Sequence, residues 1–418
     1  MSKSRIRKQS LFPGRDGILL LSAKFLRTFT YGILTVSLVI YLTSVGFTPF
    51  QIGIVLSSAI LGGVFSTIFV VLFADRLGRK KTLSLLSLFT ALTGIILGIT
   101  SDFVLVAVGM FIGSLSLTGG EVGPFLSVEQ SIIPQVTIEA ARNRAFSVYN
   151  FVGYVGLSLG SLGALVPGLL QGELGFSTRD SFLPVFALVV AAGIVLATIY
   201  QALGLRVEAP SSESRSRISL PRSSRRVVLK LSVLFGLDSF AGGFVIQSII
   251  SLWFFLRFGV NLSSLSLIIA LGQAVTAVSI LAAGRIADRI GLLKTMVSTH
   301  IISNIFLASI AFAPVLPVAV GLYLARQSLS QMDVPTRQAY TMALVPVDER
   351  TPAAGITTLS RNISQSISPS IAGYLLALGV ASGTPFLLGG GIKIAYDLLL
   401  YATFRNVQLP KQDPQTWS

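Results

Sequence analysis

The chain has 418 residues, of which 52% are hydrophobic and only 12% are charged, and its mean hydropathy is +0.78. Soluble domains carry roughly twice that charged fraction, so the composition excludes a soluble globular protein and indicates a polytopic membrane protein. A net charge of +15 would suggest nucleic acid for a soluble chain, but here the basic residues lie between long apolar runs, and we expect no nucleic-acid partner. Those unbroken runs also exclude a membrane β-barrel, whose strands alternate apolar and polar residues.

Residues that usually carry catalysis or metal binding are scarce. The chain has no cysteine and one histidine, His300, which excludes disulfides, thiolate catalysis and sites rich in Cys or His ligands. It has neither a Gly-x-x-x-x-Gly-Lys-Ser/Thr loop nor a Gly-x-Ser-x-Gly motif, so we expect neither a nucleotide-driven pump nor an enzyme. No cofactor and no metal ion are expected. For His300, the sequence leaves open a packing role and a proton-relay role.

Twelve apolar stretches are long enough to span a bilayer, which needs about 20 helical residues. In chain order, as helices 1 to 12, they are 18–42, 51–74, 82–100, 104–130, 145–170, 181–204, 227–256, 263–284, 295–313, 317–344, 354–377 and 384–404. A polar segment rich in Ser, Arg and Pro, 205–226, separates two sets of six. We therefore expect an N-terminal bundle (1–204), a flexible cytoplasmic linker (205–226) and a C-terminal bundle (227–418).

The basic residues orient these spans. If both termini are cytoplasmic, Arg179 and Arg257 are the only basic residues in the outer loops, and all other loop Lys and Arg lie inside. The positive-inside rule therefore predicts cytoplasmic termini. We expect a multi-pass protein of the cell membrane that works as a monomer in the lipid bilayer.

The two halves contain a repeat. The sequence Asp75-Arg76-Leu77-Gly78 recurs as Asp288-Arg289-Ile290-Gly291. The pairs Gly46 with Gly259 and Thr82 with Thr295 keep the same offset. Near-constant spacing of several matches predicts a duplicated unit, which is common in transporters.

This repeated motif resembles the signature of the major facilitator superfamily, Gly-x-x-x-Asp-Arg-x-Gly-Arg-Lys/Arg in the loop between helices 2 and 3. The first copy continues into Arg79-Lys80-Lys81 but has Val71 at the leading position, whereas the second copy keeps Gly284 and lacks the basic pair. The resemblance covers essentially the whole chain. It implies an all-α integral membrane fold of twelve transmembrane helices in two pseudo-symmetric six-helix bundles.

The resemblance also implies a conformational gate on the cytoplasmic side. We expect Asp75 to lie against a helix N-terminus, where the helix dipole favours an anion, and Arg76 and Arg79 to bridge to Glu129. The alternative is that these charges only set the topology. The expected gate residues are Asp75, Arg76, Gly78, Arg79, Lys80, Glu129, Asp288, Arg289 and Gly291.

Ionisable residues inside the membrane are costly and usually functional. By the resemblance, helices 1, 4, 7 and 10 line a central cavity, and each of them carries such residues: Lys24 and Arg27 on helix 1, Glu121 on helix 4, Asp238 on helix 7, and Arg326 and Asp333 on helix 10.

On helix 10 the spacing of Arg326, Asp333 and Arg337 predicts one stripe of a continuous helix. Glu121 and Asp333 each precede a proline at matched positions, and proline breaks the helix where transporters place binding sites. Either acid is a candidate for the coupling proton. The alternative is a permanent salt bridge to Arg326 or Arg337.

Three arginines, Arg27, Arg326 and Arg361, suggest an anionic substrate, because the guanidinium fork suits carboxylate and phosphate. The alternative is pairing with Asp238, Glu121 and Asp333. On helix 12, Lys393 and Asp397 are four residues apart, which predicts a self-satisfied ion pair.

The sequence therefore predicts a secondary transporter that moves a small solute by alternating access, coupled to protons, with an organic anion as the substrate. The alternative is a proton-driven efflux antiporter for drugs or metabolites. The candidate substrate or proton pathway is Arg27, Glu121, Asp238, Arg326, Asp333 and Arg361.

Overall fold

The fold comes from a computed structural model, which describes residues 12, 14–120, 123–137, 142–208, 224–346, 349–379 and 382–406. Regular structure in these ranges is entirely helical, without a strand. Within them, nine helices are long and apolar enough to cross a membrane. The predicted all-α membrane architecture is confirmed.

The chain divides into two compact units. Unit 1 comprises 1–213, 245–274 and 369–382, and unit 2 comprises 214–244, 275–368 and 383–418. From the first half of the chain, unit 1 contains α2 (Arg15–Ser44), α3 (Pro49–Leu77), α4 (Arg79–Ile99), α5 (Phe103–Gly113), α6 (Pro124–Ile132), α7 (Arg142–Gly163), α8 (Leu165–Gly172) and α9 (Thr178–Gln201), with the 3-10 turns η1 (Ile133–Gln135) and η3 (Leu205–Val207).

The second half supplies the remaining helices: α10 (Arg225–Gly243), α11 (Gln247–Phe258), α12 (Leu262–Ile290), α13 (Leu292–Ile310), α14 (Leu316–Gln327), α15 (Asp333–Ala343), α16 (Arg350–Leu378) and α17 (Thr384–Phe404). Of these, α11, the start of α12 and the end of α16 belong to unit 1. The predicted division of the chain at a linker over 205–226 stays a prediction, and residues 209–223 lie outside the described ranges.

Each predicted span coincides with helical residues. Helices 1, 2, 3 and 6 are α2, α3, α4 and α9, and helices 8, 9, 11 and 12 are α12, α13, α16 and α17. Helices 4, 5, 7 and 10 are each made of two pieces, namely α5–α6, α7–α8, α10–α11 and α14–α15. Three of the helices that the resemblance assigns to the cavity are therefore interrupted, as helices around transporter binding sites often are.

The interruptions in helices 4 and 10 have local causes. Pro124 is the first residue of α6, and Gly123 before it has φ +135°, a conformation that favours glycine. In helix 10, α14 ends at Gln327 and α15 begins at Asp333, two residues before Pro335. The predicted breaks beside the acid–proline sequences are confirmed.

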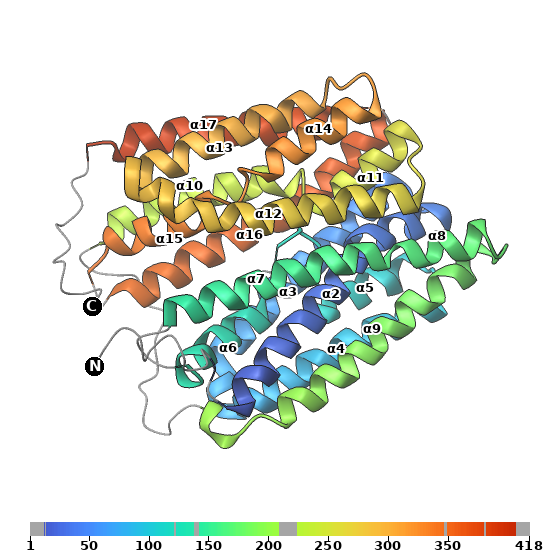
Figure 1. The fold of residues 1–418 in the computed structure, drawn as a ribbon, viewed down its shortest axis with the longest axis horizontal. Coiled ribbons are helices and arrows are strands. Elements are labelled where there is room, and N and C mark those ends of the chain that lie inside the picture. Colours follow the sequence, from blue (N-terminus) through green and yellow to red (C-terminus); the bar gives the residue numbers. More distant parts are fainter. Residues whose placement is uncertain are drawn as a thin grey trace. The chain divides into compact units, whose positions relative to one another are not determined.

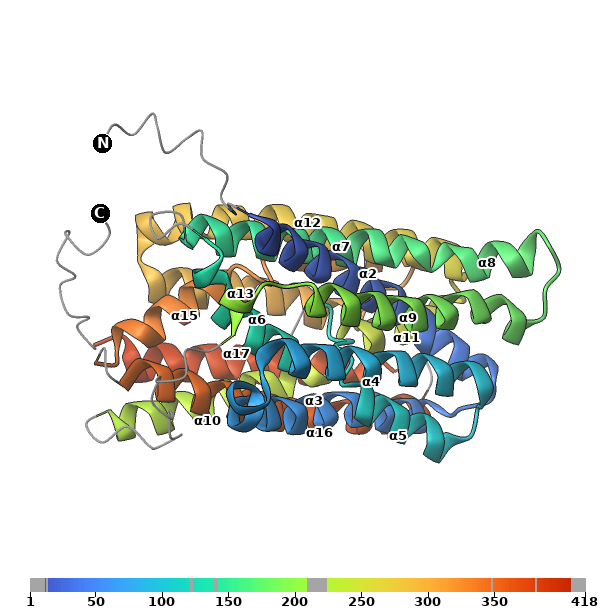
Figure 2. The same cartoon turned by 90° about the horizontal axis from the view of Figure 1, so that it is seen from below.

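Glycines allow the helices of unit 1 to pack closely. A Cβ atom on Gly156 or Gly160 of α7 would collide with the backbone of Phe25 or Phe29 on α2. These two helices run alongside each other (Figures 1 and 2). Small residues in this way permit close helix contact where lipid offers no hydrophobic driving force.

The predicted repeat is visible in the backbone. Gly78 (φ +93°) lies between α3 and α4, and Gly291 (φ +89°) lies between α12 and α13. The amides of Thr82 and Thr295 each donate to the carbonyl of the preceding motif glycine at 3.0 Å. The two copies of the motif therefore form the same turn.

Candidate functional site

The buried charge of unit 1 is centred on Glu129 of α6. Arg27 of α2 donates from Nη1 to Glu129 Oε1 (3.0 Å) and from Nη2 to Oε2 (2.5 Å). Tyr149 of α7 donates to Oε2 (2.5 Å) and Tyr200 of α9 to Oε1 (2.8 Å). The exposed fraction is 1% for Arg27 and 0% for Glu129, so this is a buried bidentate ion pair with both carboxylate oxygens bonded twice.

Aromatic rings enclose the same pair. The guanidinium of Arg27 lies 4.7 Å from the ring centre of Phe125, and the amine of Lys24 lies 4.2 Å from that of Tyr149. Such cation–π contacts add to the stability of buried cations. One expectation about this region is wrong: Glu129 pairs with Arg27 rather than with Arg76 or Arg79. The reason is that α2, α6, α7 and α9 direct these side chains into one core.

The motif turn is held by an acid that the sequence did not single out. The backbone amides of Arg79 and Lys80, the first residues of α4, donate to Glu208 Oε2 (2.6 Å) and Oε1 (3.3 Å). Asp75, expected at a helix N-terminus, instead accepts from Arg79 Nε at 3.0 Å. Glu208 therefore takes the position at the positive end of the helix dipole.

Three further hydrogen bonds hold the segment that follows α9. Arg79 Nη1 donates to the carbonyl of Val207 (3.3 Å), and the amide of Gly204 donates to Asp16 Oδ1 (2.9 Å). With its amide oriented so that both ends are bonded, Gln135 donates to the carbonyl of Arg206 (2.9 Å) and accepts from Arg79 Nη1 (2.8 Å). Sequence reasoning missed Glu208 because it assigned 205–226 to a flexible linker, although η3 continues the ordered chain past α9.

The other expected gate residues are less enclosed. Arg76 and Arg289 are exposed at the ends of α3 and α12. Gly291 forms the turn described above, and the side chain of Asp288 lies outside what the structure describes.

Unit 2 buries a larger charge cluster, centred on Asp238 of α10. Lys393 of α17 donates to Asp238 Oδ1 (2.6 Å), and Arg337 of α15 donates to Asp238 Oδ2 (3.3 Å). Arg337 also donates to Asp333 Oδ2 at 2.8 Å. Asp238 and Asp333 are each 3% exposed. Asp333 thus forms the salt bridge that the sequence left as the alternative to a proton site.

His300 of α13 connects this cluster to Asp397 of α17. Its Nδ1 lies 2.9 Å from Asp397 Oδ1, and its Nε2 lies 3.7 Å from Asp238 Oδ1. Asn304 donates to Asp397 Oδ2 at 3.4 Å. The helices α13 and α17 that carry these groups lie side by side (Figure 1).

The expected ion pair within α17 is wrong. Lys393 pairs with Asp238 and Asp397 pairs with His300, because their neighbours on α10 and α13 offer closer partners than the same helix does. Sequence reasoning left Lys393 and Asp397 out of the site and left a proton-relay role for His300 open beside a packing role. The signal that pointed to them was the presence of ionisable residues on two apolar spans, helices 9 and 12.

Arg326 and Arg361 are partly buried and differ from Arg337 and Lys393, the buried cations of the Asp238 cluster. Arg326 Nη1 donates to the amide oxygen of Gln327 (2.8 Å), and its Nε is buried without a hydrogen-bond partner. Arg361 Nε donates to the hydroxyl of Ser239 on α10 (3.0 Å). Among the described residues, neither arginine has a carboxylate within 4.0 Å.

The expected stripe on helix 10 is wrong as a single helical face. Residues 328–332 interrupt the helix between Arg326 and Asp333, so only Asp333 and Arg337 retain helical spacing. Glu121, the candidate acid of helix 4, lies outside the described residues.

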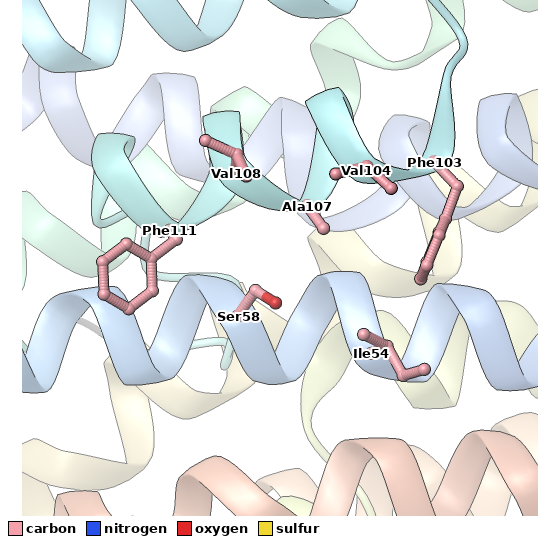
Figure 3. A pocket seen from close by; sticks show the side chains of 7 residues that line it. All are labelled: Ile54, Ser58, Phe103, Val104, Ala107, Val108 and Phe111. Atoms are coloured by element: carbon pink, nitrogen blue, oxygen red, sulfur yellow. The ribbon is translucent and has the colours of Figure 1, made fainter.

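A separate apolar groove of about 290 Å³ lies between α3 and α5, lined by Ile54, Ser58, Phe103, Val104, Ala107, Val108 and Phe111 (Figure 3). Its lining has no charged group and only one hydroxyl. It suits lipid chains rather than a polar solute. Within the described ranges, no group of three or more His, Cys, Asp or Glu side chains could hold a metal ion.

Comparison with known proteins assigns the chain to a family. The family model described as "Major Facilitator Superfamily" matches residues 20–330. The chain belongs to the major facilitator superfamily, and it is a multi-pass membrane transporter for a small molecule rather than an enzyme.

Individual relatives are distant. An uncharacterized membrane protein of Saccharomyces cerevisiae is 24% identical over 426 residues, which cover 94% of this chain and 95% of the yeast protein. Among solved structures, a bacterial homolog of the human lysosomal transporter Spinster, in an inward-facing and occupied conformation, has TM-score 0.75, 15% identity, and covers 96% of this chain and 100% of that chain. The nucleoside transporter NupG has TM-score 0.72, 16% identity, and covers 94% and 100%. At these identities, the likeness to solved structures concerns the fold alone.

Proposed function

We propose that this chain is a secondary active transporter that moves a small organic anion by alternating access, with protons as the coupling ion. The observation that carries the proposal is a contrast among the cations inside the helices. Arg27, Arg337 and Lys393 are buried and have carboxylate partners, whereas Arg326 and Arg361 are partly buried and, among the described residues, hydrogen-bond to neutral groups alone. A cation held inside a helical bundle without a counter-ion is unfavourable, so an anionic solute is the natural partner of these two arginines.

Proton coupling is supported by the acids buried in unit 2. Asp238, Asp333 and Asp397 lie in membrane-spanning helices, and each is at most 3% exposed. Carboxylates at such depth mark ion and proton pathways in transporters. Glu121 stays a second candidate for this role, on the strength of its sequence position beside a helix break.

Alternating access is supported by packing inside unit 1. Ser248 of α11 donates to the carbonyl of Thr35 on α2 (3.0 Å), and the amide of Ser370 on α16 donates to Ser57 on α3 (3.0 Å). A Cβ atom on Gly53 of α3 would collide with the carbonyl of Pro369 on α16. These contacts join α2 to α11 and α3 to α16 through uncharged groups, and we propose that they break and re-form when one end of the transporter opens and closes. The gate at the other end would involve the motif turn around Gly78 and its counterpart around Gly291.

The proposal further includes a monomer in the cell membrane with both termini in the cytoplasm. The basic loops support this orientation.

Transport into proteoliposomes tests the proposal. The probes are nicotinate and benzoate, their amides, and uridine as a neutral polar solute. With an imposed pH gradient, we expect accumulation of a carboxylate and no accumulation of its amide or of uridine. Accumulation of the amide to the same level would remove the anion proposal. Uptake that does not respond to the gradient would remove proton coupling. Arg225→Gln, which changes an exposed arginine on α10, is the control variant and should transport as the wild type does.

A further inference from the structure

The only histidine of the chain lies between two buried carboxylates. His300 is 5% exposed, Asp238 is 3% exposed and Asp397 is 0% exposed. The two ring nitrogens face different acids, because Nδ1 is 2.9 Å from Asp397 and Nε2 is 3.7 Å from Asp238. An imidazole with a carboxylate at each nitrogen can carry a proton on both nitrogens, which balances buried negative charge.

Within the part of the chain that the structure describes, the permanently charged cations of the cluster, Arg337 and Lys393, hydrogen-bond to Asp238 and Asp333 and not to Asp397. Arg337 bonds Asp333 and Asp238, and Lys393 bonds Asp238. Among the described residues, the contacts of Asp397 are with His300 and with the neutral amide of Asn304. The nearest positive charge to Asp397 is therefore that of a protonated His300, and Lys393 is a second, more distant one. Loss of the His300 charge is costly for this buried carboxylate.

Lys393 has a second position within reach. It precedes Asp397 by one helical turn on α17, the spacing at which side chains of a helix meet. Gly242 of α10 lies beside its amine, and a Cβ atom on this glycine would meet Nζ in ordinary van der Waals contact at 3.5 Å. When Lys393 turns to Asp397, Asp238 keeps Arg337 as its partner.

We propose that His300 is the proton carrier of this transporter, and that its charge decides whether Lys393 pairs with Asp238 or with Asp397. The proton comes from water and returns to water, and between these events His300 holds one positive charge. Release of the proton removes the nearest positive charge from Asp397 and draws Lys393 from Asp238 towards Asp397. Asp238 lies on α10, one of the two pieces of helix 7, which the family assigns to the cavity. Loss of the proton from His300 therefore breaks the ion pair that ties α10 to α17.

This inference rests on the proposed proton coupling and names the group that performs it. Among the described residues, the charged and titratable groups near His300 are Asp238 on α10, Asp333 on α15, and Lys393, Tyr396 and Asp397 on α17. Arg337 on α15 and Arg361 on α16 act on Asp238. The sequence left a relay role open for His300 and did not connect it with Lys393 or Asp397.

The single histidine makes a direct test possible. The full chain, prepared without a histidine tag in lipid nanodiscs and labelled with ¹⁵N and ¹³C in histidine, gives the NMR signals of one imidazole. We expect this imidazole to change charge state between about pH 5 and about pH 9. Asp397→Asn and Lys393→Gln should move the midpoint by about one pH unit or more, in opposite directions, because they remove charges of opposite sign.

Lys230→Gln, which changes an exposed lysine on α10, is the matched control and should leave the midpoint unchanged. An imidazole that keeps one charge state over the whole range, or that titrates identically in Asp397→Asn, would overturn the role of His300. The transport assay separates this result from the proposed function. If wild-type uptake ignores the pH gradient, proton coupling itself is wrong. If the gradient drives wild-type uptake and equally that of His300→Gln, coupling stands and His300 is not the carrier.

Discussion

Both units bury charged side chains in their helices, but they balance the charges by different means. In unit 1, Glu129 meets the permanently charged Arg27 in a bidentate pair, and two tyrosines occupy the remaining positions on its oxygens. In unit 2, Asp397 meets a histidine, whose charge depends on pH. The first arrangement has one stable charge state and holds four helices together. In the proposed role of His300, the second has two charge states that differ by one proton, as a proton-coupled transporter would require.

We expect the largest difference between the two clusters when one carboxylate is removed from each and the losses of stability are compared. Glu129→Gln leaves Arg27 buried without a counter-ion, and we expect a loss of about 3–5 kcal/mol in the free energy of unfolding. Asp397→Asn should cost clearly less at neutral pH, because His300 can release its proton and become neutral. Thermal and denaturant unfolding of both variants in the same detergent provides the measurement. Equal losses would mean that the two clusters play the same structural role.

The next largest effect concerns the arginines without carboxylate partners. Arg326→Gln and Arg361→Gln should weaken binding of a transported carboxylate by about tenfold to a hundredfold, the value of one or two charge-assisted hydrogen bonds. Their effect on stability should be small, whereas Arg27→Gln should mainly reduce stability. Calorimetric titration of the carboxylate and its amide separates these outcomes. An equal loss of affinity for both ligands would show that the arginines do not recognise the anion.

The smallest effect is expected at the motif turn of unit 1. Glu208→Gln removes the anion at the start of α4 and should lower stability by about 1 kcal/mol, the usual value of a lost helix cap. The control is Glu173→Gln at the exposed end of α8, where we expect no measurable change. An equal loss of stability in Glu173→Gln would indicate that Glu208 stabilises the protein through its negative charge alone and not through its place at the start of α4.

Local sequence patterns predicted the secondary structure well. Apolar length placed all twelve spans. The acid–proline sequences marked the breaks in helices 4 and 10, because proline restricts the backbone locally and glycine permits conformations that other residues avoid. The repeated Asp-Arg-x-Gly motif likewise predicted the matching turns at Gly78 and Gly291. These features act over one or two helical turns, so they can be read without knowledge of which helices meet.

The partners of the buried charges required the tertiary structure. The sequence paired Lys393 with Asp397 on one helix and Glu129 with the motif arginines, but the bonded pairs join residues far apart in the chain. Arg27 and Glu129 are 102 residues apart, and Asp238 and Lys393 are 155 residues apart. Sequence alone therefore determined that this chain is a twelve-helix membrane transporter with charges inside the bilayer. Only the packing of helix faces decided which charges neutralise one another, because an ion pair forms between the closest opposite charges after the helices have docked.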